Sequence, residues 1–156
     1  MKRQFIVMII VYLLSLYVNF FEAIKYPDVN ITVVNFIVSS IFVVFFYKGI
    51  VSIREKSNIV NAILLMGIVL SASVNLLSEL EIHSLGKLNF VFDILSSLQY
   101  PAYVLFVIPL FGFNILFHVQ YSIFSYIASA FYFFVYIMRL WSRKHKRLKD
   151  NHESFT

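Results

Sequence analysis

The sequence predicts an all-α protein, a polytopic bundle of transmembrane helices, and its composition and its pattern of apolar stretches both support this fold class. Apolar residues make up 60% of the 156 residues, and charged residues make up 13%. Soluble domains are roughly 45–50% apolar and about 25% charged. Charged side chains are therefore too few to cover a water-soluble surface. We expect residues 1–156 to form one integral membrane domain with a short basic tail over residues 142–156.

Five apolar stretches run along the chain. A helix that crosses the hydrocarbon core needs about 20 apolar residues, with a range of roughly 17–25. The first three stretches and the last one fit a single span each, and none shows the strict alternation of a barrel strand. The five stretches are Phe5–Phe21, Ile31–Tyr47, Ile59–Ser78, Phe90–Phe117 and Val119–Trp141. The first is expected to be an uncleaved helix rather than a signal peptide, because no small-x-small cleavage site follows it.

The fourth stretch contains residues that interrupt a helix. Pro101, Pro109 and Gly112 fall within it, together with the polar residues Asp93 and Gln99. Proline removes a backbone donor and kinks or breaks a helix, and irregular backbone at membrane depth requires a protein-lined or wet environment. We therefore expect a broken, re-entrant segment beside four full spans. An ordinary kinked span, which gives five spans in total, is the alternative.

The basic residues predict the orientation of the chain, since cytoplasmic loops carry an excess of Lys and Arg. With four spans and both termini inside, all thirteen basic residues except Lys25 and Lys87 lie on the cytoplasmic side. With five spans and the N-terminus outside, five basic residues lie outside. These are Lys2, Arg3, Lys48, Arg54 and Lys56. The four-span topology is favoured. Abundant Ile, Phe, Asn and Lys are typical of an AT-rich bacterial genome, so we expect a bacterial cytoplasmic membrane.

Several polar residues are expected at similar depth near the outer face, where they form a candidate polar cluster. Its members are Glu22, Asn35, Asn75, Glu79, Asp93 and Gln99. Ionisable residues inside a membrane are costly and often functional, which favours a shallow pocket with Glu79 or Asp93 as its charged group. The alternative, which we favour, is that these residues pack helices and that the carboxylates lie at the water boundary, where they cost little.

Small residues are predicted to form helix-packing surfaces. Gly67 and Ser71 are four residues apart on the third stretch, and Ser125 and Ser129 are four apart on the last, so each pair shares one helix face. Small residues permit close helix approach, and hydroxyls form hydrogen bonds between membrane helices. A pore lining by the last helix is the less favoured interpretation.

The basic tail is expected to lie at the cytoplasmic surface next to Trp141. Its residues are Arg139, Arg143, Lys144, Lys146, Arg147 and Lys149. Such juxtamembrane clusters attract anionic lipid by about 1 kcal/mol per basic residue. The alternative is a positive anchor that needs no partner. Nucleic-acid binding is not expected, because no base-stacking aromatic platform accompanies the short cluster.

No catalytic motif stands out in the sequence. The chain has no Cys, which excludes thiol chemistry and disulfides. It also lacks a Gly-rich phosphate loop, a Gly-x-Ser-x-Gly elbow and a His-Glu-x-x-His helix. Glu79 and His83 are four residues apart but have no second histidine in register, so we expect no metal and no cofactor.

The favoured function is a non-catalytic membrane protein that acts by helix–helix contact with a membrane partner, as an accessory, assembly or protective protein. Minimal loops and small-residue stripes support this interpretation. A small oligomeric transporter or channel that uses segment 90–117 is the main alternative, because discontinuous helices are typical of transporters. A membrane-embedded enzyme is a lesser alternative, since it requires paired acid and base groups held close together.

Overall fold

Every regular element in the described part of the chain is a helix, as the sequence predicted. The computed structural model describes residues 2–52, 58–79, 97 and 99–153. The elements are α1 (Lys2–Lys25), α2 (Val33–Ser52), α3 (Asn58–Glu79), the π-helix η2 (Tyr103–Val107), the 3-10 helix η3 (Ile108–Phe113), α5 (Asn114–Phe117) and α6 (Tyr121–Glu153).

In the described part of the chain, four helical stretches are long and apolar enough to cross a membrane, which supports a transmembrane protein. These stretches are Gln4–Lys25, Val33–Ile50, Gln99–Phe117 and Tyr121–Arg143. The set differs from the four full spans expected from the sequence. It includes Gln99–Phe117, which is long and apolar enough to span despite its changes of helix type. The apolar part of α3, Asn58–Val74, is shorter.

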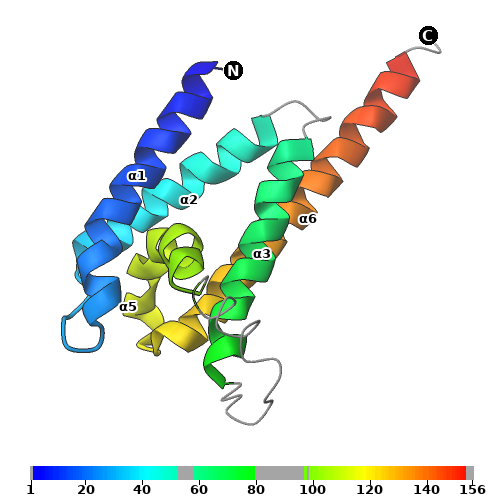
Figure 1. Cartoon of the computed structure of the whole chain (residues 1–156). Coiled ribbons are helices and arrows are strands. Elements are labelled where there is room, and N and C mark those ends of the chain that lie inside the picture. The colour runs from blue at the N-terminus through cyan, green and yellow to red at the C-terminus, as the bar shows by residue number, and fades with distance from the viewer. Residues whose placement is uncertain (1, 53–57, 80–96, 98, 154–156) are drawn as a thin grey trace.

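The helices form two antiparallel pairs, and the end of α2 approaches the start of α3 at one end of the bundle (Figure 1). Helices α1 and α2 form one pair, α3 and α6 form the other, and residues 99–117 lie between them. We call residues 99–117 the broken segment. Helix α1 begins and α6 ends at the same end of the bundle, which we call the tail end; the α1–α2 connection lies at the opposite, loop end.

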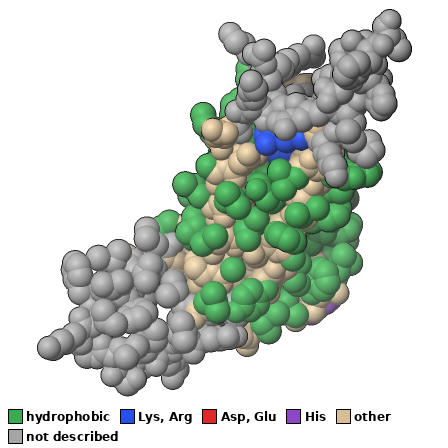
Figure 2. Space-filling view, turned by 90° about the vertical axis from the view of Figure 1, so that its right-hand side faces the viewer, with side chains coloured by type: hydrophobic (Ala, Val, Ile, Leu, Met, Phe, Trp, Pro, Cys, Tyr) green, Lys and Arg blue, Asp and Glu red, His purple; other side chains and the backbone are tan. Residues whose placement is uncertain are grey.

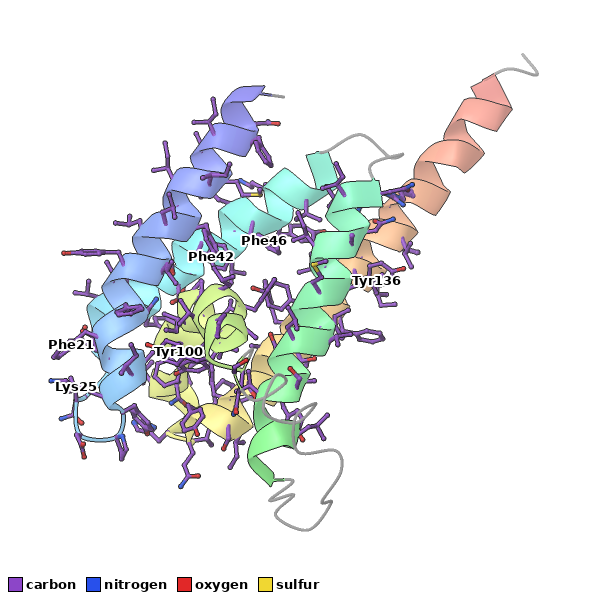
Figure 3. All side chains as sticks on the ribbon, viewed as in Figure 1. Phe21, Lys25, Phe42, Phe46, Tyr100 and Tyr136 are labelled. Carbon is purple, nitrogen blue, oxygen red and sulfur yellow. The ribbon has the colours of Figure 1, made fainter. Side chains whose placement is uncertain are left out.

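The interior of the bundle is centred on the broken segment. Val107, Ile108 and Phe111 have no exposed surface, and the Phe111 ring packs edge-on against Phe124 of α6 at a centroid distance of 5.2 Å. Phe42, also fully buried, lies on α2 beside this core (Figure 3). The face shown in Figure 2 carries many apolar side chains, and a small patch of Lys and Arg lies on it near the tail end.

Candidate functional site

The broken segment changes its helix type where proline removes a backbone donor. In an α-helix the carbonyl of residue i accepts from the N–H of residue i+4, so Pro109 leaves the Leu105 carbonyl without its usual donor. Residues Tyr103–Val107 form a π-helix in which the Ile108 N–H donates to the Tyr103 oxygen, and a 3-10 helix follows from Ile108. Backbone oxygens freed in this way need donors from elsewhere.

Two tyrosines from flanking helices supply donors to the segment. The Tyr12 hydroxyl of α1 donates to the Leu105 oxygen at 2.9 Å, and the Tyr132 hydroxyl of α6 donates to the Phe106 oxygen at 3.0 Å. The two carbonyls are therefore held from opposite sides, by one helix of each pair.

Two serines converge on the Pro109 carbonyl, three residues further along the segment. Ser15 of α1 and Ser39 of α2 both donate to the Pro109 oxygen, at 2.7 and 3.0 Å, and both serines are fully buried. A carbonyl oxygen has two lone pairs, so one acceptor can bind both hydroxyls. This single oxygen links α1, α2 and the broken segment.

Asn19 extends these contacts into a buried polar network. Its amide nitrogen lies 2.8 Å from the Ser15 carbonyl, 3.2 Å from the Ser15 hydroxyl and 3.0 Å from the Ser39 hydroxyl. Its amide oxygen is buried and has no hydrogen-bond partner among the described residues. We call Ser15, Asn19, Ser39 and the Pro109 carbonyl the serine–asparagine network.

Gly112 allows the broken segment to reach α2. A Cβ atom at this position would lie 2.1 Å from the Asn35 carbonyl oxygen and 2.6 Å from the Ser39 Oγ. Real Cβ atoms do not approach backbone this closely, so any side chain at residue 112 requires the two elements to move apart. The absence of a side chain thus sets the distance between η3 and α2.

A tight turn ends the broken segment. Residue His118 has a left-handed backbone with a φ of 51°, a conformation that non-glycine residues rarely adopt. Buried Asn114 closes the turn, because its Oδ1 accepts from the Val119 N–H at 3.1 Å and its Nδ2 donates to the Val119 carbonyl at 2.8 Å. The chain then enters α6.

A pocket lies at the mouth of the broken segment, at the loop end of the bundle. Its volume is about 290 Å³, and it is lined by Ala23, Ile24, Val74, Gln99, Tyr100, Tyr103 and Tyr121. We call it the tyrosine pocket. Gln99 donates to the Val74 carbonyl at 2.7 Å, and Tyr103 donates to the Ala23 carbonyl at 2.9 Å. Both bonds fix pocket walls to neighbouring helices.

The structure places half of the predicted polar cluster in three separate locations. Gln99 lines the tyrosine pocket, whereas Glu22 lines an open groove on the outer side of α1. Asn35 is buried near the start of α2: its Oδ1 accepts from the Thr32 backbone N–H at 2.9 Å, and its Nδ2 donates to the Val18 carbonyl at 3.0 Å. This arrangement caps the helix, as a capping box does, and ties α2 to α1.

The other three members of the cluster fall outside what the structure describes in full. The backbone of Asn75 and Glu79 lies in α3, but their side chains are outside the described residues, as is all of Asp93. Among the described residues, no three potential ligands come together to hold a metal ion.

The predicted packing residues lie between α3 and α6 or close to this interface. A Cβ at Gly67 would lie 2.8 Å from the Tyr132 ring, so the ring rests against the glycine. Ser129 donates across the interface to the Ile68 carbonyl at 2.8 Å. Ser71 is fully buried and its Oγ has no partner among the described residues, whereas Ser125 bonds to the Ser122 carbonyl of its own helix.

Two residues of the predicted basic tail lie close to the bundle. Arg139 is 2% exposed, and its guanidinium donates to the Ile50 carbonyl of α2 and, at 3.2 Å, to Asn61 Oδ1 of α3. It therefore connects α2, α3 and α6. Nε and Nη2 of Arg143 are buried without a partner among the described residues. The remaining tail side chains, those of Lys144, Lys146, Arg147 and Lys149, are outside the described residues.

Sequence reasoning did not identify Tyr12, Ser15 and Ser39 as important residues. One signal was present: Ser15 and Asn19 are four residues apart on α1, and Asn35 and Ser39 are four apart on α2. Such spacing puts each pair on one helix face. Two polar pairs on otherwise apolar helices indicate a buried interhelical contact, although the acceptor, a proline carbonyl, cannot be found from spacing.

Comparisons of the chain with models of protein families, with curated proteins and with solved structures give no match.

Proposed function

We propose that this chain is a non-catalytic multi-pass membrane protein that acts by helix contact with a membrane partner, as an accessory, assembly or protective protein. The observation that carries the proposal is that carbonyl oxygens of the broken segment already accept hydrogen bonds within the chain. In transporters with discontinuous helices, freed carbonyls coordinate the transported ions. Here the oxygens of Leu105, Phe106 and Pro109 already accept hydrogen bonds from hydroxyl groups of the same chain.

The distribution of charge supports the same proposal. In the described spans, Asp, Glu, Lys and Arg occur only toward the helix ends, as with Glu22 and Lys25 of α1, Lys48 of α2 and Arg139 of α6. Coupled transport commonly uses an ionisable group near the membrane midplane. The central turns described here offer no such group.

Helix α1 is the candidate contact surface for a transmembrane helix of the partner. Only 11% of its span is buried within the chain, against 33%, 50% and 39% for the other three stretches. Its outer side carries an open groove, which Tyr17 and Glu22 help to line.

Site-specific photo-crosslinking in cells tests the contact proposal. A photoreactive phenylalanine replaces Tyr17, which is 81% exposed on α1, or Phe134, which is 58% exposed on α6 and serves as the matched control. We expect one protein adduct of discrete mass from position 17 and none from position 134. Lipid adducts alone at both positions would overturn the proposal that α1 is the contact surface.

A small oligomeric transporter or channel is the second candidate, and the tyrosine pocket at the mouth of the broken segment favours it. Proteoliposomes separate the two candidates. A protein-dependent flux of an ion or solute that Asp93→Asn abolishes would replace the contact proposal. A flux no larger than that of protein-free liposomes agrees with the contact proposal.

We further propose a topology of four spans with both termini in the cytoplasm of a bacterial cell and with a re-entrant broken segment. Tyr100, at the start of the segment, and Tyr121, just beyond its end, line the same pocket. A segment that begins and ends at one level returns to the side from which it entered. This supports counting α1, α2, α3 and α6 as the spans.

Cysteine labelling tests the topology, since the chain has no native Cys. Asp28→Cys lies in the α1–α2 connection and Asn58→Cys at the start of α3, and both positions are exposed. With a membrane-impermeant maleimide on intact cells, we expect Asp28→Cys to react and Asn58→Cys to react only after lysis. The reverse pattern would establish an outside N-terminus and would contradict the four-span topology.

A further inference from the structure

We propose that the tyrosine pocket binds an ammonium group, carried either by a lipid head group or by a small free cation. Of the seven described residues that line it, three are tyrosines: Tyr100, Tyr103 and Tyr121. Aromatic ring faces carry negative electrostatic potential, and cages of such rings recognise choline and methylated amines. The inference does not depend on whether the protein acts through a partner.

Two of the pocket's tyrosine rings are in edge-to-face contact with each other. Tyr103 and Tyr121 lie 5.6 Å apart between centroids, with their planes at 69°, and Tyr103 also packs edge-on against Phe111. Tyr100 belongs to the same segment, three residues before Tyr103, a spacing that puts two residues on one helix face. Tyr103 is held rigidly by its bond to the Ala23 carbonyl.

The described lining also offers oxygen atoms to an ammonium group. One amide N–H of Gln99 donates to the Val74 carbonyl, and the Tyr103 hydroxyl donates to the Ala23 carbonyl. The amide oxygen of Gln99 can only accept, and its partial negative charge attracts a cation. No Lys or Arg is among the described residues that line the pocket.

The nearest lysine along α1 is directed elsewhere. Lys25 follows Ala23 by two residues, which is about 200° around a helix. Its Nζ lies 4.4 Å from the centroid of the Phe21 ring, on the outer side of α1 (Figure 3). This pair also shows an ammonium group lying over an aromatic face at the same end of the molecule.

The size and depth of the pocket suit a small head group. Its volume of about 290 Å³ is at the lower limit of small-molecule pockets, which range over roughly 300–1,000 Å³. Ala23 and Ile24 lie in the last turn of α1, and Tyr121 is the first residue of α6. The pocket thus lies at the ends of these helices, where lipid head groups meet the protein and tyrosine is a common anchor.

Binding of choline to the full chain in maltoside detergent is the first test. The matched control ligand is 3,3-dimethyl-1-butanol, which has the shape of choline but no charge. By equilibrium dialysis with labelled choline, we expect the neutral analogue to bind at least about fivefold more weakly, since cation–π attraction is worth about 1 kcal/mol. Equal affinities, or no choline binding, would overturn the proposal and leave the tyrosines as an interfacial belt only.

Variants of one wall residue locate the site. We expect Tyr121→Leu to weaken choline binding about fivefold and Tyr121→Phe, which keeps the ring, to bind nearly as the original chain does. Tyr126→Leu is the matched control, because Tyr126 is an exposed tyrosine of the same helix that does not line the pocket. Equal losses in Tyr121→Leu and Tyr126→Leu would place any binding elsewhere and overturn the assignment.

Native mass spectrometry distinguishes the two sources of the ammonium group. The chain is released from nanodiscs of phosphatidylcholine and phosphatidylglycerol in equal amounts. Preferential retention of phosphatidylcholine, lost in Tyr121→Leu, identifies a lipid head group as the ligand. Choline binding without this preference identifies a free cation.

Discussion

The two helix pairs hold the broken segment by different means. On the α1–α2 side the contact is polar: Ser15 and Ser39 donate to the Pro109 carbonyl, and Gly112 lies against the Asn35 backbone. On the α3–α6 side aromatic rings dominate, since Phe124 packs on Phe111 and the Tyr132 ring lies between Gly67 and Phe106. At Gly112 the close approach is to backbone, and at Gly67 it is to a side-chain ring.

This difference has consequences for tolerance to change. Lipid is as apolar as a helix surface, so membrane helices associate through close packing and hydrogen bonds rather than through a hydrophobic driving force. A contact made with backbone atoms cannot adjust without moving a whole helix. A contact made with a ring can adjust by a small shift of that side chain while both helices stay in place. We therefore expect the α1–α2 side to be the more sensitive half.

Gly112→Ala is expected to have the largest effect, a loss of about 3 kcal/mol in the free energy of unfolding. The added methyl group would lie 2.1 Å from the Asn35 carbonyl oxygen, and backbone must shift to accommodate it. Unfolding by SDS in mixed micelles, followed by far-UV circular dichroism, measures the loss.

Gly49→Ala is the matched control for this variant. Its Cβ would meet the Met8 sulfur at 2.6 Å, and an unbranched methionine side chain adapts readily. We expect a change below about 1 kcal/mol. Equal losses of unfolding free energy in Gly49→Ala and Gly112→Ala would show that a contact with backbone is no more sensitive to an added methyl group than a contact with a side chain.

Removal of both serine hydroxyls from the Pro109 carbonyl is expected to rank second. Ser15→Ala and Ser39→Ala each leave one donor in place, so each is expected to cost about 0.6 kcal/mol, the average for interhelical hydrogen bonds in membranes. The double variant leaves a buried carbonyl without either donor and is expected to cost about 2 kcal/mol. A double-mutant cycle in SDS measures the coupling; strictly additive losses would contradict a shared acceptor.

Gly67→Ala is expected to have the smallest effect of the three, about 1 kcal/mol. The added Cβ would lie 2.8 Å from the buried Tyr132 ring, so a side chain must shift here, whereas backbone must shift at Gly112. The same SDS titration measures it. A loss as large as that of Gly112→Ala would remove the distinction between the two halves of the molecule.

Particular elements show how far the sequence could predict this fold. The apolar stretches predicted helical membrane segments, because their length and composition directly meet the requirement of a hydrocarbon core. The prolines and glycine of the fourth stretch indicated a break, and the structure shows π and 3-10 helix there. The pattern did not reveal that hydroxyls from α1, α2 and α6 bond to the freed carbonyls, since those contacts join residues far apart in the chain.

The candidate site was less predictable than the fold. Grouping Glu22, Asn35 and Gln99 at one depth was reasonable from helix lengths, but depth does not specify the direction in which a side chain points. In the structure Glu22 lines the outer groove, Asn35 caps the start of α2 and Gln99 lines the tyrosine pocket. The sequence by itself determined a helical membrane chain and the place of its break, because both depend on local composition. Only the tertiary structure decided which oxygen each hydroxyl meets and which rings enclose a pocket, because both depend on helix rotation and long-range packing.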